Sequence, residues 1–218
     1  MPGRGSSSIA LHLGYYLALT AAYARADMSQ IYPIARGGAP LVTAFASVAL
    51  VGEAISPVQG AGIAALCGVM LISLLGRRKG QAFDPVALGF AGLTALMISG
   101  YTLVDGIGAR TAGDPHAYSS ALFVIDGFPL VLYALWRRGA AGLAPMRPYL
   151  LQGLAGGAMS LGSYWIAIWA MTVAPIPLVA AVRESSVLFA ALIAVVLLKE
   201  PLQWSRAARP RSSSAPSC

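Results

Sequence analysis

Charged residues are scarce in this sequence. Asp, Glu, Lys and Arg together make up 11% of its 218 residues, whereas hydrophobic residues make up 57%. Ordinary globular domains carry about 25% charged residues, so this chain cannot cover a normal soluble surface. Its apolar residues also fall into blocks of about 20, the length that crosses ~30 Å of hydrocarbon. The sequence therefore predicts a polytopic membrane protein of the all-α class.

The residue types of catalytic and metal sites are also few. The chain has two His and two Cys, none of them at a metal-ligand spacing. Cys67 lies inside an apolar block and Cys218 is the last residue, so no disulfide framework is implied. The sequence has no Gly-Lys-Ser/Thr phosphate-binding loop that would indicate ATP-driven work, and no nucleophile stands beside a base. We therefore predict no enzyme activity, no metal and no cofactor.

The net charge of +7 would suggest nucleic-acid binding in a soluble chain. Here the basic residues lie between the apolar blocks, where positive charge is typical of cytoplasmic loops. The predicted partners are therefore the lipid bilayer and a small-molecule solute, with a homo-oligomer as a further expectation, and no nucleic acid.

Seven apolar blocks are separated by short connections rich in Gly, Pro, Asp and Ser, which suit helix ends and turns. We expect each block to form a transmembrane helix. The first block, with Arg4 before it and "AYA" at its end, also resembles a secretory signal peptide; the repeat described next argues against that alternative. The expected spans are Ile9–Tyr23, Tyr32–Val51, Val58–Leu75, Val86–Ile107, Tyr118–Trp136, Leu150–Met171 and Pro177–Leu198.

Two segments repeat one another: "ARGGAPLVTAFASVALVGE" and "VRESSVLFAALIAVVLLKE". Aligned without a gap, Arg36 meets Arg183 and Glu53 meets Glu200, both at an offset of 147 residues (183 − 36). Four expected spans lie between the two segments, so each unit contains five helices. Because five is odd, the second copy is inverted in the membrane, a construction used by many secondary transporters.

Two five-helix units need more residues than this chain has, so we expect it to correspond to helices three to nine of a ten-helix protein. On this interpretation residues 1–79 hold three helices of the first half. Residues 80–204 hold four helices of the second half, whose last helix is missing. Residues 205–218, rich in Ser, Arg and Pro, form a disordered basic tail.

The segments "SQIYPIARGGAPLVTAFASVALVGEAISPVQGAGIAALCGVMLI" and "APIPLVAAVRESSVLFAALIAVVLLKEPLQW" strongly resemble the EamA-like branch of the drug/metabolite transporter superfamily. The "YPIARG" start, the "GE" and "KEP" ends and the glycine-containing helix that follows carry the resemblance. It implies ten helices in two inverted five-helix halves around a central cavity. It also implies multi-pass insertion in a bacterial-type inner membrane and transport of small metabolites.

Two predictors of orientation disagree. The positive-inside rule places the Arg-rich loops in the cytoplasm, whereas the family pattern, with both termini usually cytoplasmic, places the loop at 77–79 outside. We favour the charge rule, because it uses residues present in this chain. The basic loops hold Arg77, Arg78, Lys79, Arg137, Arg138 and Arg147, and the opposite loops hold Glu53, Arg110, Asp114 and His116.

Arg36 and Arg183 are the first candidate site residues. A charged residue near the middle of a bilayer costs about 2.5–3.5 kcal/mol on insertion scales, so such residues usually face a cavity or a partner. Both lie roughly 6–9 Å inside their spans, and long side chains at that depth can also extend to the interface. Their recurrence in both halves favours the cavity, because an interfacial anchor would accept Lys equally well.

Glu184 and Asp126 are the acids well inside the spans, apart from Asp105 near a helix end. Glu184 follows Arg183, so their side chains project about 100° apart on a helix. They cannot both face lipid without a large free-energy cost. Either Glu184 or Asp126 could bind a proton and couple transport to the proton gradient. The alternative for Asp126 is that it caps a helix break in the following "GFP".

Aromatic and hydroxyl side chains near these charges could line the same cavity. Interfacial belts explain aromatic residues at span ends, whereas a packed bundle also buries aromatic residues. Small residues at four-residue spacing, such as Gly60, Ala64 and Gly68, or Gly153 and Gly157, predict close helix contacts. The expected cavity residues besides the charged ones are Tyr16, Ser160, Tyr164, Trp165, Ser185 and Ser186.

These patterns favour a secondary transporter of small organic solutes that works by alternating access between two inverted halves. Arg36 and Arg183 would contact the solute or stabilise the gates, and Glu184 would carry a proton. The alternative is a non-transporting truncated fragment, or a structural helix-bundle subunit that needs a partner to complete its fold. The absent helices favour this alternative, and the intact pair of motifs favours transport.

Overall fold

The structure is a computed structural model that describes residues 2–26, 28–72, 84–139 and 148–189. All regular elements in these ranges are helical, which confirms the all-α class. A π-helical turn, η1, continues α2 directly. The elements are α1 (Pro2–Tyr23), α2 (Met28–Ala46), η1 (Ser47–Val51), α3 (Pro57–Ile72), α4 (Pro85–Thr111), α5 (Pro115–Arg138), α6 (Leu150–Val173) and α7 (Ile176–Glu184).

Each of the seven expected spans falls on one of these helices. α1 and α2 begin earlier than predicted, and α4 ends one turn later, at Thr111. α7 ends at Glu184, where a turn at Ser185 interrupts the helical backbone before it resumes at 186–189. The remainder of the last expected span, and the tail at 205–218, lie outside the described residues. The loop residues at 77–79 and Arg147 lie outside them as well.

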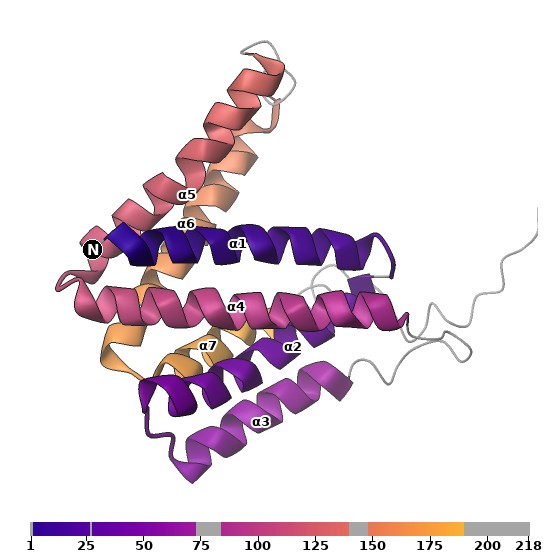
Figure 1. The fold of residues 1–218 in the computed structure, drawn as a ribbon, viewed down its shortest axis with the longest axis vertical. Coiled ribbons are helices and arrows are strands. Elements are labelled where there is room, and N and C mark those ends of the chain that lie inside the picture. The colour runs from indigo at the N-terminus through magenta and orange to yellow at the C-terminus, as the bar shows by residue number, and fades with distance from the viewer. Residues whose placement is uncertain (1, 27, 73–83, 140–147, 190–218) are drawn as a thin grey trace, which may run out of the picture.

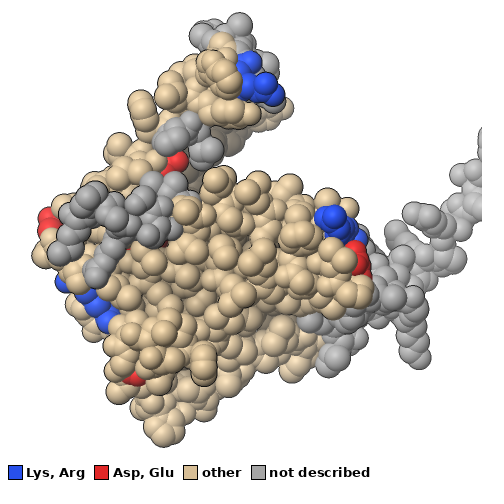
Figure 2. Space-filling view, in the orientation of Figure 1, with Lys and Arg blue, Asp and Glu red and all other residues tan. Residues whose placement is uncertain are grey.

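Four helices within the described ranges are long and apolar enough to cross a membrane, as expected of a helical membrane protein. They comprise Ile31–Val51, Pro85–Thr111, Pro115–Arg137 and Leu150–Val173, and α3 is a shorter apolar helix. The number of seven spans and the inverted repeat stay predictions. Figure 2 shows a face that is largely uncharged, with its charged side chains in small groups.

Two helices begin with the same dipeptide, Asp-Pro, and for the same physical reason. Asp84 accepts a hydrogen bond from the Val86 backbone N–H (2.9 Å), and Asp114 accepts one from the His116 N–H (2.8 Å). An N-terminal Asp satisfies one of the free amides of the first turn, and Pro at the first helical position has no amide to satisfy. These caps fix the starts of α4 and α5.

α4 is the core of the bundle. Half of the residues in its most apolar 18-residue stretch are buried inside the protein, compared with 13% for the same stretch of α5 and 17% for that of α6. α1 and α2 both pack against α4, and α3 and α7 pack against α2. α5 and α6 lie side by side and project away from the other helices (Figure 1). Their exposed apolar surfaces are suited to contact with lipid.

Glycines bring α1 close to α4. A Cβ atom at Gly100 would lie 3.1 Å from Leu11, and one at Gly14 would lie 3.0 Å from Met97. In the described part of the chain, the predicted contacts at Gly60, Gly68, Gly153 and Gly157 do not form, because nothing lies within 4 Å of a Cβ built at any of them. Gly37 on α2 also allows close packing, because a Cβ atom there would lie 3.1 Å from Met70 Cβ on α3.

α2 and α7 run antiparallel. Arg36, in the first half of α2, contacts Glu184 at the end of α7. Glu53, just after η1, contacts Ile176 at the start of α7. Gly52, directly before Glu53, ends η1 with φ at +74°, a left-handed conformation that favours glycine.

Candidate functional site

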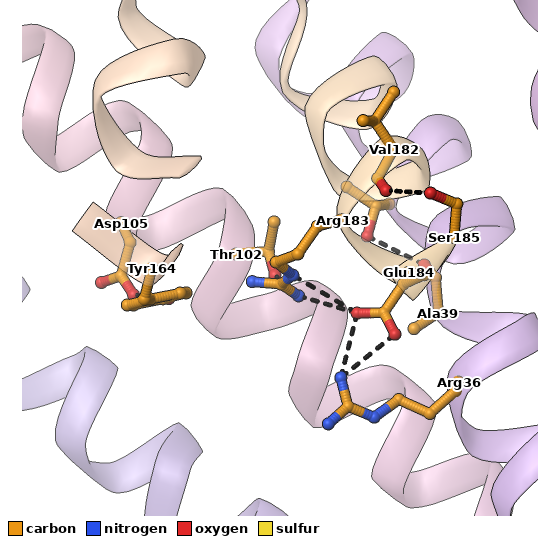
Figure 3. Close-up of polar contacts among 10 residues, drawn as sticks. Arg36, Ala39, Thr102, Asp105, Tyr164, Val182, Arg183, Glu184 and Ser185 are labelled. Atoms are coloured by element: carbon orange, nitrogen blue, oxygen red, sulfur yellow. Dashed lines mark hydrogen bonds and ion pairs between the residues drawn. The ribbon is translucent and has the colours of Figure 1, made fainter. Parts of the chain in front are cut away.

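A buried carboxylate from α7 accepts hydrogen bonds from an arginine on α2. Glu184 is 1% exposed, and Arg36 Nη1 lies 3.1 Å from both Oε1 and Oε2 (Figure 3). The sequence left open whether Arg36 extends to the interface or faces inward. Its guanidinium group points to Glu184, inside the bundle.

A second arginine binds the same carboxylate. Arg183 donates to Glu184 Oε1 from Nε (3.3 Å) and from Nη2 (3.1 Å), and Nη2 also lies 3.4 Å from Thr102 Oγ1 on α4. We name Arg36, Arg183 and Glu184 the arginine–glutamate cluster. Buried ions are tolerated when they are paired and hydrogen-bonded. This cluster has two guanidinium groups and one carboxylate, so it carries one uncompensated positive charge.

Tyrosine rings cover both guanidinium groups. The Arg183 Cζ atom lies 5.5 Å from the ring centroid of Tyr164 and 5.8 Å from that of Tyr101. The Arg36 Cζ atom lies 5.6 Å from the Tyr32 ring. Cations within about 6 Å of an aromatic ring face are attracted to it electrostatically. The rings therefore stabilise the excess positive charge where water is scarce.

The end of α7 holds the cluster in place. The Ser185 hydroxyl donates to the carbonyl oxygen of Val182 (2.6 Å), and its backbone N–H donates to the carbonyls of Ala181 and Val182. Serine side chains compete in this way with regular helix hydrogen bonds, and here the α-helix ends. Arg183 lies in the last turn, where a cation is favourable beside the free carbonyl groups.

A second buried carboxylate lies nearby on α4. Asp105 is 0% exposed, and three hydroxyl groups donate to it. Ser8 and Tyr118 donate to Oδ1 (2.7 and 3.0 Å), and Tyr164 donates to Oδ2 (2.6 Å). We name Asp105, Ser8, Tyr118 and Tyr164 the Asp105 site. It joins α1, α4, α5 and α6, and Tyr164 connects it to Arg183 (Figure 3).

A third polar group lies at one end of the bundle. The Glu53 carboxylate pairs with Arg110 (2.5 Å) and accepts hydrogen bonds from the Ser47 hydroxyl (2.7 Å) and the Ile176 backbone N–H (3.0 Å). Arg110 also donates to the carbonyl oxygens of Met171 (2.7 Å) and residue 174 (2.9 Å). The Glu53–Arg110 ion pair therefore joins the connection between α6 and α7 to the ends of η1 and α4.

The structure brings together only part of the predicted cavity lining. Tyr164 contacts the cluster, and Ser185 forms the turn beside it. Trp165 instead donates from Nε1 to His116 Nδ1 (2.8 Å). Tyr16 is 54% exposed and packs edge-on against Tyr15. Ser160 and Ser186 are exposed and Asp126 is half-buried, and none of the three forms a hydrogen bond or ion pair with the cluster among the described residues.

The sequence patterns do not single out Asp105 or Tyr101 as site residues. The expected span predicts Asp105 near a helix end, whereas α4 continues to Thr111 and Asp105 is buried inside the bundle. An acid inside an apolar helix is costly unless it has partners, and that signal was present in the sequence "TLVDGIGAR".

No group of three or more metal-ligating side chains comes together within the described ranges. Comparison of the chain with protein-family models, with curated protein sequences and with solved structures gave no match.

Proposed function

We propose that this chain belongs to a secondary transporter of small organic solutes, of the EamA type. The arginine–glutamate cluster is the observation that carries the proposal. Three charged side chains inside a bundle of apolar helices are costly, and such groups usually mark the path of a solute or ion. Secondary transporters place their binding sites between two related halves, and α2 and α7 belong to the two halves of the proposed repeat.

The helix order supports the inverted repeat. Shifted by the offset of 147 residues, α1 (2–23) becomes 149–170, close to α6 at 150–173. The first residue of α2, at 28, becomes 175, next to the start of α7 at 176. The matched helices α2 and α7 also run antiparallel, as the corresponding helices of inverted halves should.

The charge of the cluster indicates the kind of solute. Glu184 compensates one of two guanidinium groups, so a solute with one anionic group would compensate the other. Arginine binds carboxylates and phosphates through two parallel hydrogen bonds. We therefore favour solutes that carry a carboxylate or a phosphate. Such a solute would compete with Glu184 for Arg36 and Arg183, and so loosen the contact between α2 and α7.

Reconstituted protein tests the proposal. The chain is inserted into liposomes, and uptake of a panel of radiolabelled amino acids, organic acids and sugar phosphates is measured. Arg183→Gln should abolish uptake of any solute the chain carries, while membrane insertion is retained. Arg137→Gln, which changes an exposed residue on α5, is the matched control and should transport normally. Unchanged flux in Arg183→Gln would overturn the proposed role of the cluster.

The structural-subunit alternative makes a different prediction. If the cluster only holds helices together, no member of the panel is transported. Arg183→Gln then lowers stability, and crosslinking in membranes captures the chain in a defined complex with another protein. Flux and complex formation therefore distinguish the two functions.

A further inference from the structure

The Asp105 site differs from the arginine–glutamate cluster in how its charge is compensated. Glu184 lies between two guanidinium groups, and Glu53 pairs with Arg110. Asp105, although fully buried, accepts hydrogen bonds from three neutral hydroxyl groups, and no Lys or Arg of the described part of the chain forms an ion pair with it. A buried charge without a counter-ion is costly, and binding of a proton removes that charge.

A histidine lies next to this carboxylate. His12 Nδ1 lies 3.4 Å from the Ser8 Oγ and 3.0 Å from the Ser8 carbonyl oxygen. Ser8 Oγ in turn donates to Asp105 Oδ1 at 2.7 Å. The His12 ring is held by stacking on Tyr101, with centroids 4.2 Å apart and planes 17° from parallel. His12, Ser8 and Asp105 thus form a continuous line of groups that can exchange protons.

We propose that Asp105 is a proton-binding site that is loaded from His12 through Ser8. The imidazolium of His12 gives a proton to the Ser8 oxygen, and Ser8 passes its own hydroxyl proton to Asp105 Oδ1. The products are a neutral imidazole, an unchanged serine and a neutral carboxylic acid. Only N–H and O–H bonds break and form, and no other reactant is needed.

The titratable and charged groups around Asp105 come from every helix that packs against it. His12 on α1 is the group that can supply a proton, and the hydroxyl groups of Tyr118 and Tyr164 are hydrogen-bond donors. Arg183 on α7 contacts the Tyr164 ring and not Asp105 itself, and Arg110 on α4 is engaged by Glu53. The groups are His12, Tyr101, Tyr118, Tyr164, Arg110 and Arg183.

Tyr164 links proton binding to the arginine–glutamate cluster. Its hydroxyl donates to Asp105 Oδ2, and its ring lies against the Arg183 guanidinium group. A neutral carboxylic acid is a weaker acceptor than a carboxylate, so protonation weakens the bond that holds Tyr164 over Arg183. The use of this link to couple a proton to solute movement rests on the proposed transport function, whereas proton binding itself does not.

Infrared difference spectra of the full chain in lipid nanodiscs test the proposal without any solute. Lowering the pH should produce the C=O stretching band of a protonated carboxylic acid. The band should shift when aspartate carboxyl groups are labelled with ¹³C, which excludes Glu184 as its source. It should be lost in Asp105→Asn and retained in Asp126→Asn, the matched acid on α5. Loss in Asp126→Asn with retention in Asp105→Asn would overturn the proposal, as would the absence of any aspartate band.

Two further variants keep the test decisive if Asp105→Asn does not fold. Tyr164→Phe removes the hydrogen bond to Asp105 Oδ2, which is the carbonyl oxygen when the proton is on Oδ1, so the band should move to higher frequency; an unchanged frequency contradicts the assignment. His12→Phe keeps a ring on Tyr101 but removes both nitrogens. The band should then keep its amplitude and rise more slowly after a pH jump, and an unchanged rate would exclude His12 as the donor. A chain that shows the band but transports no solute would refute the transport function and leave the proton site intact.

Discussion

Arg36 and Glu184 are separated by 148 positions in the sequence, yet one nitrogen of Arg36 lies 3.1 Å from both carboxylate oxygens of Glu184. Arg183, next to Glu184, binds the same carboxylate and lies at the position that matches Arg36 in the repeat. The two matched arginines therefore converge on one acid. This relationship ties the packing of α2 against α7 to the charges that we assign to solute binding.

Glu184→Gln should destabilise the protein strongly. The substitution keeps the size of the side chain but leaves two guanidinium groups without a counter-ion inside the bundle. Removing one partner of a buried ion pair typically costs about 3–5 kcal/mol. Unfolding of the purified protein in mixed micelles by increasing SDS measures the change. Asp126→Asn, which removes a half-buried acid away from the cluster, should cost much less, and equal losses in both variants would contradict the prediction.

The charged residues of the arginine–glutamate cluster could be identified from the sequence, whereas the hydrogen-bond partners of Asp105 could not. Arg36, Arg183 and Glu184 are conspicuous because each is charged within an apolar block, and the repeat aligns the arginines. The sequence predicts Asp105 near a helix end because the expected span stops at Ile107, whereas the helix extends one turn further. Its partners come from three other helices, and only tertiary packing brings them to one point.

The contacts made by the glycines could not be predicted from the sequence either. Four-residue spacing identifies small residues on one face of a helix, but it does not say whether another helix covers that face. Gly153 and Gly157 have the predicted spacing and face open space, whereas Gly100 and Gly106 on α4 lie against side chains of other helices. Burial follows from the position of α4 at the centre of the bundle, which local sequence does not specify.

Gly106→Ala should destabilise the bundle. A Cβ atom there would lie 2.8 Å from Ile176 Cδ1 and 3.2 Å from Met171 Sδ. Both side chains are fully buried, so they have no free space to move into. Overpacking costs about 1–3 kcal/mol, which exceeds the gain of about 1 kcal/mol for Ala over Gly in a helix.

Gly153→Ala is the matched control for Gly106→Ala. Because nothing lies within 4 Å of a Cβ at Gly153, only the helix-propensity gain of up to about 1 kcal/mol should remain. SDS unfolding of the two variants should therefore shift in opposite directions. A shift of the same sign in both would contradict the packing described for α4.

Glu53→Gln should loosen the start of α7. The Ile176 amide donates to the Glu53 carboxylate, and Arg110 holds both Glu53 and the end of α6. The neutral amide loses the ion pair and weakens the hydrogen bond, so amides in the first turn of α7 should exchange faster with deuterium. Mass spectrometry of peptides over 174–180 measures this exchange. Asp84→Ala, which removes the side-chain cap of α4, should speed exchange at the start of α4 instead.

Arg36→Lys distinguishes binding inside the bundle from anchoring at the membrane interface. Lysine keeps the charge and the length needed to reach the interface. It cannot form the planar contact by which arginine binds a carboxylate. If Arg36 binds Glu184 and the solute, Arg36→Lys should lower flux about tenfold, which corresponds to ~1.4 kcal/mol. Arg137→Lys, at an exposed site on α5, should leave flux unchanged. Full activity in Arg36→Lys would assign Arg36 to the interface and leave Arg183 alone as the solute-binding cation.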